Sequence, residues 1–322
     1  MTTIILHYKN CAALSADYPS DHFTATVTSP PYKVEDGYSF SLMREMAEKL
    51  YTTTKPGGLA FINFAHLAED WGRPFEVFQA FNEKNWHSLS TIIWVKSMVF
   101  PGLGGVAKET IDTAIDALCH QCGPVEMVDG PISTDLLRTF DKQTVADIEV
   151  LQSLTRPRQV GHFTPIEAPS RLNNLFEYIF VFAKPPVPAL DKWTPPNGVE
   201  YSDKRNLSRD GRGKRGDRHC GGNVWFLPYS TTGQKSKKAH AYSYPEELVV
   251  RCLRMAGCQP GDWVLDPFCG GGTTAQVANR LGFNTVTYEL NEAIAKNTFE
   301  DVKRTMMPGT EVVWKVAENL TS

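Results

Sequence analysis

Hydrophobic residues follow two different spacings along the first 100 residues of this chain. Apolar runs rich in β-branched residues predict strands at 3–8, 23–28, 59–64 and 90–95. Apolar residues at helical spacing predict helices at 38–54 and 74–84. Strands that alternate with helices in this way are typical of βαβ units in a mostly parallel sheet.

This pattern stops after residue 100 and returns in the last third of the chain. Residues 101–165 are bounded by glycines, acidic and partly helical, so we expect an insertion there. A strand is predicted at 175–183, and residues 185–240 are rich in Pro, Gly, Lys and Arg. Helices are then predicted at 245–255, 273–281 and 291–305, with strands at 263–265, 285–288 and 312–314.

Composition restricts the classes of protein to which this chain can belong. It has 322 residues, of which 42% are hydrophobic and 21% charged, and these values argue against extensive disorder. The net charge of −3 means that any nucleic-acid binding must come from a local basic patch. Neither a signal peptide nor a run of 18 apolar residues is present, so we expect a soluble cytoplasmic protein without membrane contact.

The seven cysteines are scattered and show no disulfide-framework spacing, which favours reduced thiols. Cys119 and Cys122 have the spacing of a zinc-binding pair, but no second pair lies nearby. We therefore expect no metal site, with two buried thiols as the simpler interpretation of this pair.

A chemically unusual segment follows the predicted strand 23–28. Ser29-Pro30-Pro31-Tyr32 contains two prolines, which fix the backbone and supply no N–H. A hydroxyl, a carbonyl without local partners and an aromatic ring are thereby held together. This set suits a flat base with an exocyclic amine, because it offers two hydrogen-bond acceptors and a ring for stacking. A Pro-rich turn without chemistry is the alternative.

A second candidate site follows the predicted strand 263–265. Residues 264–274 indicate a strand, a glycine-rich turn and a helix start, where free N–H groups can contact a ligand. No Lys stands at the helix start, which argues against a phosphate-binding P-loop. A dinucleotide site stays open, because Gly270-x-Gly272-x-x-Ala275 fits its loose pattern and Glu289 ends the next strand.

S-adenosylmethionine is the other ligand that this turn would suit. It needs the same glycines and a ribose-binding acid, but no cradle for a pyrophosphate. Asp266-Pro267-Phe268 favours it, because the carboxylate would hold the cationic methionine end and Phe268 would lie against the adenosine. A glycine turn with only a structural role is the remaining interpretation.

Taken together and in this order, the two motifs resemble the amino-methylating DNA methyltransferases of restriction-modification systems. The resemblance is to the circularly permuted group, in which the catalytic motif precedes the cofactor motif, and it covers most of the chain outside 101–160. Ser29-Pro30-Pro31-Tyr32 resembles the catalytic motif of the cytosine-N4 branch. Adenine-N6 enzymes more often begin this motif with Asp or Asn.

The resemblance also implies which residues bind S-adenosylmethionine. Glu289 matches the ribose-binding acid, and Asn10 stands where relatives often have an Asp near the adenine ring. Tyr244 and Pro245 belong to an element that closes the cofactor pocket in the family, although Ala241 and Tyr242 depart from its pattern. The segment from Gly161 to Glu177 resembles another part of the cytosine-N4 branch. The implied cofactor residues are Asn10, His240, Tyr244, Pro245, Asp266, Phe268, Gly270, Gly272, Thr273, Thr274 and Glu289.

The implied fold is an α/β, Rossmann-like methyltransferase fold with a mixed, mostly parallel and permuted sheet. Residues 1–100 would form the catalytic half and 241–322 the cofactor-binding half. An inserted helical lobe at 101–165, a return to the sheet at 166–184 and a basic target-recognition region at 185–240 would lie between them.

The implied activity is methylation of the N4 amine of a flipped cytosine in double-stranded DNA, with a cognate restriction endonuclease as genetic partner. Ser29 and the Pro30 carbonyl would accept hydrogen bonds from the amine, and Tyr32 would stack on the base. No Pro-Cys pair is present, which argues against cytosine-C5 methylation. Adenine-N6 methylation is the near alternative, and nicotinamide-dependent oxidation and a non-catalytic DNA-binding module are the remote ones.

A cluster of basic residues between 204 and 218 is the candidate DNA contact. Only Asp210 and Asp217 oppose it, and three glycines make the segment supple. A solvated surface loop is the alternative. The basic residues of this cluster are Lys204, Arg205, Arg209, Arg212, Lys214, Arg215 and Arg218.

If this cluster contacts phosphates, DNA binding will weaken steeply as salt concentration rises. Each neutralised phosphate contributes about −0.9 to the slope of log affinity against log salt. Binding titrations at several salt concentrations measure this slope. An affinity that does not change with salt would remove the cluster from the DNA-binding surface.

Overall fold

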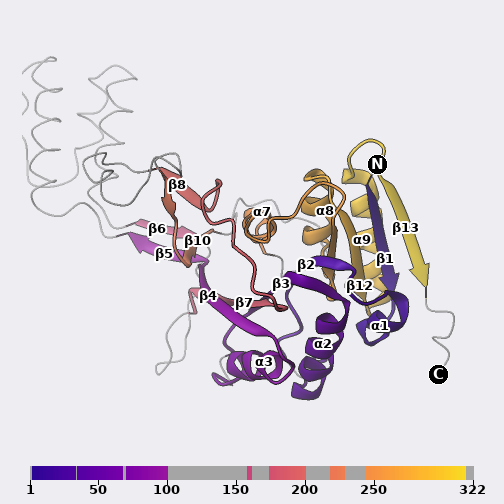
Figure 1. Ribbon diagram of the computed structural model, residues 1–322, viewed down its shortest axis with the longest axis horizontal. Helices are drawn as coiled ribbons and strands as arrows, with labels where there is room; N and C mark the ends of the chain where they lie inside the picture. Colours follow the sequence, from indigo (N-terminus) through magenta and orange to yellow (C-terminus); the bar gives the residue numbers. More distant parts are fainter. Residues whose placement is uncertain are drawn as a thin grey trace, which may run out of the picture. The chain divides into compact units, whose positions relative to one another are not determined.

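The computed structural model describes residues 2–33, 35–67, 70–100, 158–161, 174–200, 218–228 and 244–316 (Figure 1). The chain divides into two compact units, one of residues 1–96 and 163–322 and one of residues 97–162. The predicted insertion at 101–165 overlaps the second unit, and its predicted helices lie outside the described residues. In that unit, β5 (Ser97–Phe100) and β6 (Arg158–Gly161) pair antiparallel.

The first unit is built on a nine-stranded sheet. All its neighbouring strands are parallel except β7, which runs antiparallel to the strands on both of its sides. β1 lies between β12 and β13, so the first strand of the chain completes the part of the sheet built from the last strands. The order is β10 (Val224–Phe226), β4 (His87–Val95), β7 (Phe176–Ala183), β3 (Thr54–Phe64), β2 (Phe23–Thr28), β11 (Trp263–Asp266), β12 (Asn284–Glu289), β1 (Thr3–Tyr8) and β13 (Glu311–Val316).

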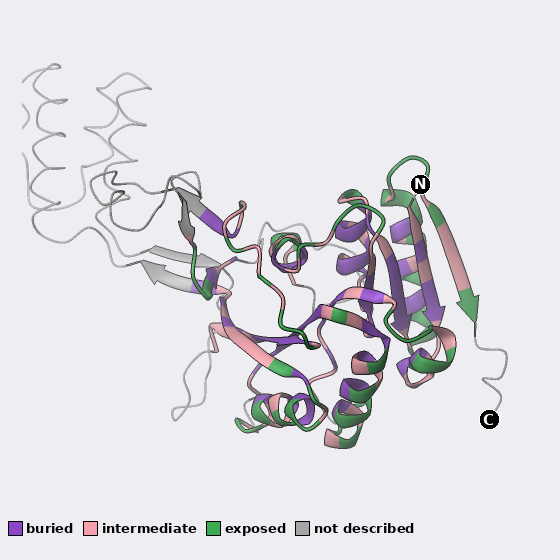
Figure 2. Ribbon diagram, in the orientation of Figure 1, coloured by how far each residue is buried: buried purple, intermediate pink, exposed green. Residues whose placement is uncertain are grey.

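Helices cover both faces of this sheet (Figure 1). α2 (Phe40–Thr53) and α3 (Arg73–Asn82) pack against one face, where the rings of Phe81 and Phe182 stack with centroids 4.6 Å apart. α7 (Glu246–Met255) and α8 (Thr273–Arg280) cover the other face over β2, β3 and β11, and α9 (Glu292–Thr305) covers β1. Figure 2 shows the buried residues gathered on the strands and on the helix sides that face them.

Every strand and helix that the hydrophobic pattern predicts in the first unit is present, with ends shifted by a few residues. β3 is longer than expected and includes Lys55-Pro56-Gly57-Gly58. Its pairing with β2 jumps from Phe23–Thr54 to Ala25–Leu59, so an irregularity absorbs these residues. Gly57 has a φ of 78° there, and its N–H donates to the Lys184 carbonyl over 2.8 Å.

Three features of the described residues escape the hydrophobic pattern. A short 3-10 helix, η1 (Cys11–Ala13), and a single turn, α1 (Leu14–Asp17), follow β1. The two-stranded sheet of β8 (Gly198–Glu200) and β9 (Arg218–Cys220) frames the ends of the basic segment. After this segment the chain returns to the main sheet at β10, where Trp225 is buried.

Among the described helices, none is both long and apolar enough to cross a membrane.

Trp94 of β4 is buried in the core and binds the segment directly after the edge strand β10, so its replacement tests how this edge packs on the core. Its ring is fully buried, and its indole N–H donates to the Leu227 carbonyl over 2.9 Å. We expect Trp94→Phe to reduce the free energy of unfolding by about 2–4 kcal/mol, because the carbonyl loses its partner and a cavity opens. Urea denaturation measures the change.

Trp71 provides the matched control, because 52% of its surface is exposed. Trp71→Phe should change stability by no more than about 0.5 kcal/mol. Equal effects of the two substitutions would contradict the assignment of Trp94 to the core.

Candidate active site

The two predicted motifs meet at one edge of the sheet. β2 and β11 are parallel neighbours, paired at Ala25–Val264 and Thr26–Leu265, so their carboxyl ends lie side by side. Ser29 follows β2, Pro267 follows β11, and Glu289 ends the next strand, β12. Ligand sites of open parallel sheets lie at this edge. The structure therefore brings together residues that the sequence separates widely.

A hydrogen-bond network occupies the edge directly behind Ser29. The Ser29 hydroxyl lies 2.7 Å from the Tyr32 hydroxyl, which donates to Glu177 Oε2 over 3.0 Å. The Asn63 amide nitrogen donates to Tyr32 Oη over 2.8 Å and to Glu177 Oε2 over 2.7 Å. These groups come from β3, β7 and the segment after β2. The catalytic motif is thus anchored to the middle of the sheet.

Two cations hold this network in place. Lys96 Nζ lies 2.9 Å from Glu177 Oε1, and the side chains of both residues are largely buried. Arg73 at the start of α3 donates to the Tyr32 carbonyl over 2.7 Å and also pairs with Asp70. Sequence reasoning did not identify Asn63, Lys96 or Arg73 as site residues. The one local signal was the polar Asn63 inside the apolar strand β3.

Tyr32 makes contacts within the protein that the sequence did not predict, and its stacking on a base stays a prediction. Its ring packs against Phe64, with centroids 4.6 Å apart, and its hydroxyl joins the network behind Ser29. Pro30 is buried, while Ser29, Pro31 and Tyr32 are half-buried. The segment therefore presents its outer side at the edge while its hydroxyl groups connect it to β3 and β7.

Asp266 links the catalytic and cofactor segments from the interior. It is fully buried, and its Oδ1 accepts from the Thr28 hydroxyl over 2.6 Å and from the Phe268 N–H over 3.2 Å. Its Oδ2 accepts from the Tyr244 hydroxyl over 3.3 Å, and Tyr244 lies 2.5 Å from the Thr274 hydroxyl. The structure therefore gives this carboxyl group protein partners, where we predicted contact with a methionine end.

Burial raises the pKa of Asp266 to about 7, although the hydrogen bond from Thr28 and those from its other donors act in the opposite direction. Burial likewise raises the pKa of Tyr244 well above its ordinary value. Tyr244 therefore remains a hydrogen-bond donor at neutral pH.

The glycine-rich turn has room for a ligand on one side only. Gly270 and Gly272 both have positive φ, at 48° and 74°. A Cβ on Gly272 would lie 2.7 Å from Thr298 Cγ2 of α9, so close packing requires glycine there. A Cβ on Gly270 would meet nothing within 4 Å. The open side of the turn therefore lies at Gly270.

Glu289 is placed beside this open side. Its Oε2 accepts from the Gly270 N–H over 3.1 Å, and its Oε1 accepts from the Asn291 N–H over 2.9 Å. α8 begins at this turn, and its N-cap, Gly272, makes no side-chain hydrogen bond. Phe268 is half-buried next to the turn. A carboxylate, a glycine turn and a helix start thus face the same space, as a nucleoside-containing cofactor requires.

The segment after β1 reaches the same edge. A crevice of about 10 Å³ lies between α2, Pro267 and the 3-10 helix η1, and Cys11 and Ala12 line it. Asn10 precedes η1 and caps it, because its side chain accepts from the Ala12 N–H over 2.9 Å. The exposed Asn10 therefore has a structural role, and its contact with a cofactor stays a prediction.

Several predicted site residues lie outside the described part of the chain. These are His240 and the basic residues from Lys204 to Arg215, and Arg218 is described only as backbone in β9. Pro245 precedes α7 and fixes the chain beside Tyr244. Their roles toward cofactor and DNA stay predictions.

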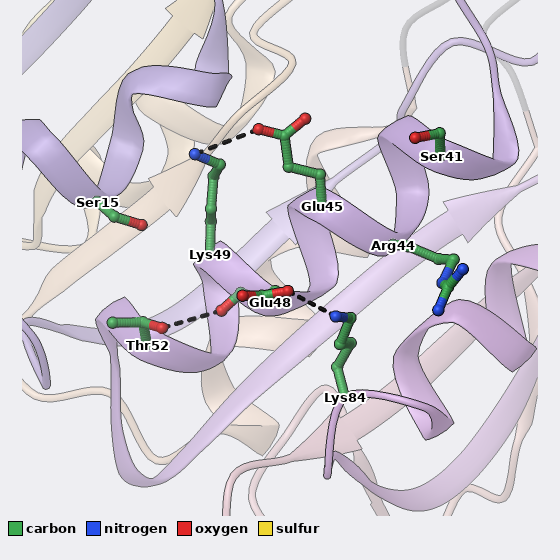
Figure 3. A pocket seen from close by; sticks show the side chains of 8 residues that line it. All are labelled: Ser15, Ser41, Arg44, Glu45, Glu48, Lys49, Thr52 and Lys84. Atoms are coloured by element: carbon green, nitrogen blue, oxygen red, sulfur yellow. Dashed lines mark hydrogen bonds and ion pairs between the residues drawn. The ribbon is translucent and has the colours of Figure 1, made fainter.

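A larger hollow of about 430 Å³ lies along α2 (Figure 3), and Glu45 and Lys49 line both it and the crevice. Its charged side chains pair with one another, as Lys49 does with Glu45 and Lys84 with Glu48. Arg44, the remaining charged side chain of the lining, pairs with Glu83 outside it. Across the described residues, no three His, Cys, Asp or Glu side chains are grouped to hold a metal ion.

Comparison with protein families identifies relatives of this chain. The model of a DNA methylase family of N6 and N4 enzymes matches residues 23–300. Type II methyltransferase M.MthZI of Methanothermobacter thermautotrophicus is 23% identical over 325 residues, covering 98% of this chain and 80% of the relative. Type II methyltransferase M.HinfI of Haemophilus influenzae is 34% identical over 88 residues, which are 25% of this chain and 24% of that protein.

Solved structures share the fold. The cytosine-N4-specific PvuII DNA methyltransferase matches with a TM-score of 0.56 at 13% identity, over 97% of this chain and 96% of its own. TTHA0409 of Thermus thermophilus, assigned as a DNA modification methylase, matches with a TM-score of 0.53 at 20% identity, over 97% and 100%. The predicted α/β fold with a mostly parallel sheet is thereby confirmed.

The raised pKa of Asp266 predicts a specific pH dependence of stability. Between about pH 4 and pH 7 the folded chain keeps a proton on Asp266 that the unfolded chain loses. The free energy of unfolding therefore falls as pH rises through this window, by up to about 1.4 kcal/mol per pH unit. Asp266→Asn removes this contribution.

Wild type must be compared with Asp266→Asn because His7 changes the free energy of unfolding with pH in the opposite direction. Burial lowers the pKa of His7 to about 4, so its contribution to stability rises with pH over part of the same window. Urea denaturation of wild type and Asp266→Asn at pH 5 and pH 7 isolates the Asp266 contribution. Identical pH slopes in both proteins would show that Asp266 is ionised at pH 5.

Proposed function

This chain belongs to the DNA methylase family of N6 and N4 enzymes, and we propose that it methylates the N4 amine of cytosine in double-stranded DNA with S-adenosylmethionine as methyl donor. The observation that supports this best is the position of Ser29. Its hydroxyl stands at the end of β2, beside the strand whose end carries the glycine-rich turn. Family membership also removes the nicotinamide-dependent oxidoreductase from consideration.

The residues at the turn fit S-adenosylmethionine. Glu289 would accept hydrogen bonds from the ribose, and the open side of Gly270 would admit the cofactor to the backbone. Phe268 would lie against the adenosine. When bound, the cofactor supplies a methyl group activated by its sulfonium. TTHA0409, which has the same fold, has been solved in complex with S-adenosyl-L-methionine.

Ser29 and the Pro30 carbonyl would prepare the amine for transfer. The lone pair of an exocyclic amine is delocalised into the base ring, which makes the nitrogen a poor nucleophile. Acceptors for its two hydrogens would localise the lone pair and orient it, so the chemistry depends on positioning and electrostatics. The rigid backbone at Pro30 and Pro31 and the network behind Ser29 supply such positioning.

Cytosine is proposed as the target because the motif begins with Ser29. Ser at this position resembles the cytosine-N4 branch, and the PvuII enzyme of similar fold is cytosine-N4-specific. Asp or Asn at this position is more frequent among adenine-N6 enzymes, so adenine is the second candidate. A base within a duplex cannot reach the edge of this sheet, and the target nucleotide must therefore flip out.

The relatives are type II methyltransferases, which supports a role in restriction and modification. A cognate endonuclease with the same recognition sequence would be the genetic partner. The basic segment between β8 and β9 would bring the phosphates of the duplex to the site.

The modified base identifies the reaction directly. DNA isolated from cells that express the wild-type chain is hydrolysed and its nucleosides are separated by mass. We expect N4-methylcytosine, and N6-methyladenine would move the chain to the adenine branch. Neither base in repeated preparations, with cofactor and DNA both bound, would indicate a DNA-binding module.

Ser29→Ala tests the catalytic role in the same assay. Loss of one acceptor should lower the rate of methyl transfer by about 100-fold or more, while cofactor affinity and melting temperature stay unchanged. Ser41 at the hollow on α2 serves as a matched control, and Ser41→Ala should be fully active. Full activity of Ser29→Ala would contradict the assignment.

A further inference from the structure

Glu177 is an almost fully buried carboxylate that no described role of the motif requires. It is 6% exposed and stands near the start of β7, 145 residues from Tyr32 in sequence. Its two oxygens have different partners. Oε1 pairs with the Lys96 ammonium at 2.9 Å, and Oε2 accepts from Tyr32 and from Asn63.

The donors around Glu177 fix the direction of every hydrogen bond in the network. An ammonium group only donates, and the carboxylate that it faces only accepts. The single proton of the Tyr32 hydroxyl therefore points to Glu177 Oε2. The amide nitrogen of Asn63 also donates to Tyr32 Oη, at 2.8 Å.

Only one proton then remains for the 2.7 Å contact between Ser29 and Tyr32. Tyr32 has already given its proton to Glu177, so Ser29 must be the donor in this contact. With its proton turned inward to Tyr32, the Ser29 oxygen can only accept from other groups. The Asn63 amide nitrogen lies 3.5 Å from it as a long, weak donor, which leaves a lone pair of this oxygen for a group outside the network. Such an oxygen accepts a hydrogen bond from an amine, because its own O–H does not point toward the amine hydrogens.

We propose that Glu177, paired with Lys96, directs the hydrogen-bond chain from Ser29 through Tyr32 and thereby makes Ser29 a hydrogen-bond acceptor toward the target amine. Glu177 and Lys96 are positioning residues, because they act through Tyr32 and do not touch the base. This inference rests on the proposed function. It assigns the Tyr32 hydroxyl a role that is separate from stacking of its ring.

The desolvation cost of the Lys96–Glu177 ion pair supports its role in setting the direction of the hydrogen bonds. Burying a carboxylate and an ammonium carries a desolvation penalty that their attraction often fails to exceed, and an apolar pair of similar size is often as stable. The pair at Lys96 and Glu177 lies at the edge of the sheet, at the end of a chain that leads to Ser29. A pair that only stabilised the fold would need no such connection.

Glu177→Gln is the decisive substitution, because an amide has one acceptor and one donor. Lys96 can only donate, so the amide oxygen will face Lys96 and the amide NH₂ will face Tyr32. The Tyr32 proton then turns to Ser29, and the Ser29 proton turns toward the amine. We expect the rate of methyl transfer to fall about 100-fold, with S-adenosylmethionine affinity by calorimetry and DNA affinity within about twofold of wild type.

The double variant Lys96→Met with Glu177→Gln should restore the wild-type direction of the hydrogen bonds from Ser29 through Tyr32 to residue 177. Without the ammonium, the amide oxygen is free to accept from Tyr32 and Asn63, as the carboxylate does. We expect this double variant to transfer methyl groups at least about tenfold faster than Glu177→Gln alone. A role of Glu177 in stability alone predicts the opposite, because the double variant loses one more buried contact.

Tyr32→Phe tests the same chain without a buried amide, so it applies even if Glu177→Gln does not fold. It keeps the ring against Phe64 and removes the hydroxyl. We expect a loss of rate close to that of Glu177→Gln, and no further loss when the two substitutions are combined, because the chain is broken only once.

The outcomes separate this inference from the proposed function. All rates are measured with radiolabelled S-adenosylmethionine and DNA from a host that lacks DNA methyltransferases. A wild-type chain that transfers no methyl groups refutes the proposed function and this inference with it. An active wild type with an equally active Glu177→Gln or Tyr32→Phe refutes only the inference. A double variant as slow as Glu177→Gln also overturns it.

Discussion

The hydrogen bond from Thr28 to Asp266 is the contact on which the arrangement of this site depends. It joins two residues 238 positions apart at the ends of neighbouring parallel strands, and both side chains are fully buried. Ser29 follows one partner and Pro267 the other, so this bond fixes the distance between the catalytic segment and the glycine-rich turn. Tyr244 donates to the same carboxyl group, which adds the start of α7 to the junction. One buried group thus aligns three separate parts of the chain.

The parallel sheet explains why these segments meet at all. β2, β11, β12 and β1 are neighbours that run in the same direction, so everything that follows them lies at a single edge. Apolar layers on both faces hold these strands, with α2 and α3 on one side and α7 and α8 on the other. The edge itself is polar because the strands end there. The fold therefore separates the residues that stabilise it from those available for chemistry.

Much of this arrangement can be predicted from the sequence, because it depends on local patterns. Alternating strands and helices indicate the parallel sheet, and Ser29–Tyr32 and Asp266–Thr274 follow predicted strands. The partners of those segments cannot be found in this way. Glu177 meets both Tyr32 and Lys96 only through the pairing of β7 between β3 and β4, which no local pattern specifies. The hydrogen bonds of Asp266 to Thr28 and Tyr244 likewise join distant segments and have no local signal in the sequence, and its contact with a cofactor stays a prediction.

The two buried carboxyl groups at this edge, Asp266 and Glu177, have different partners and different roles. Asp266 accepts from neutral donors, and burial raises its pKa to about 7. Glu177 instead pairs with the Lys96 ammonium at 2.9 Å and accepts hydrogen bonds from Tyr32 and Asn63. The contact between segments at Asp266 needs only hydrogen bonds. The series of hydrogen bonds from Ser29 through Tyr32 must keep one direction, so it needs to end on a group that only accepts. The lysine beside Glu177 supplies that condition, whereas the neutral donors described around Asp266 suit a purely structural junction.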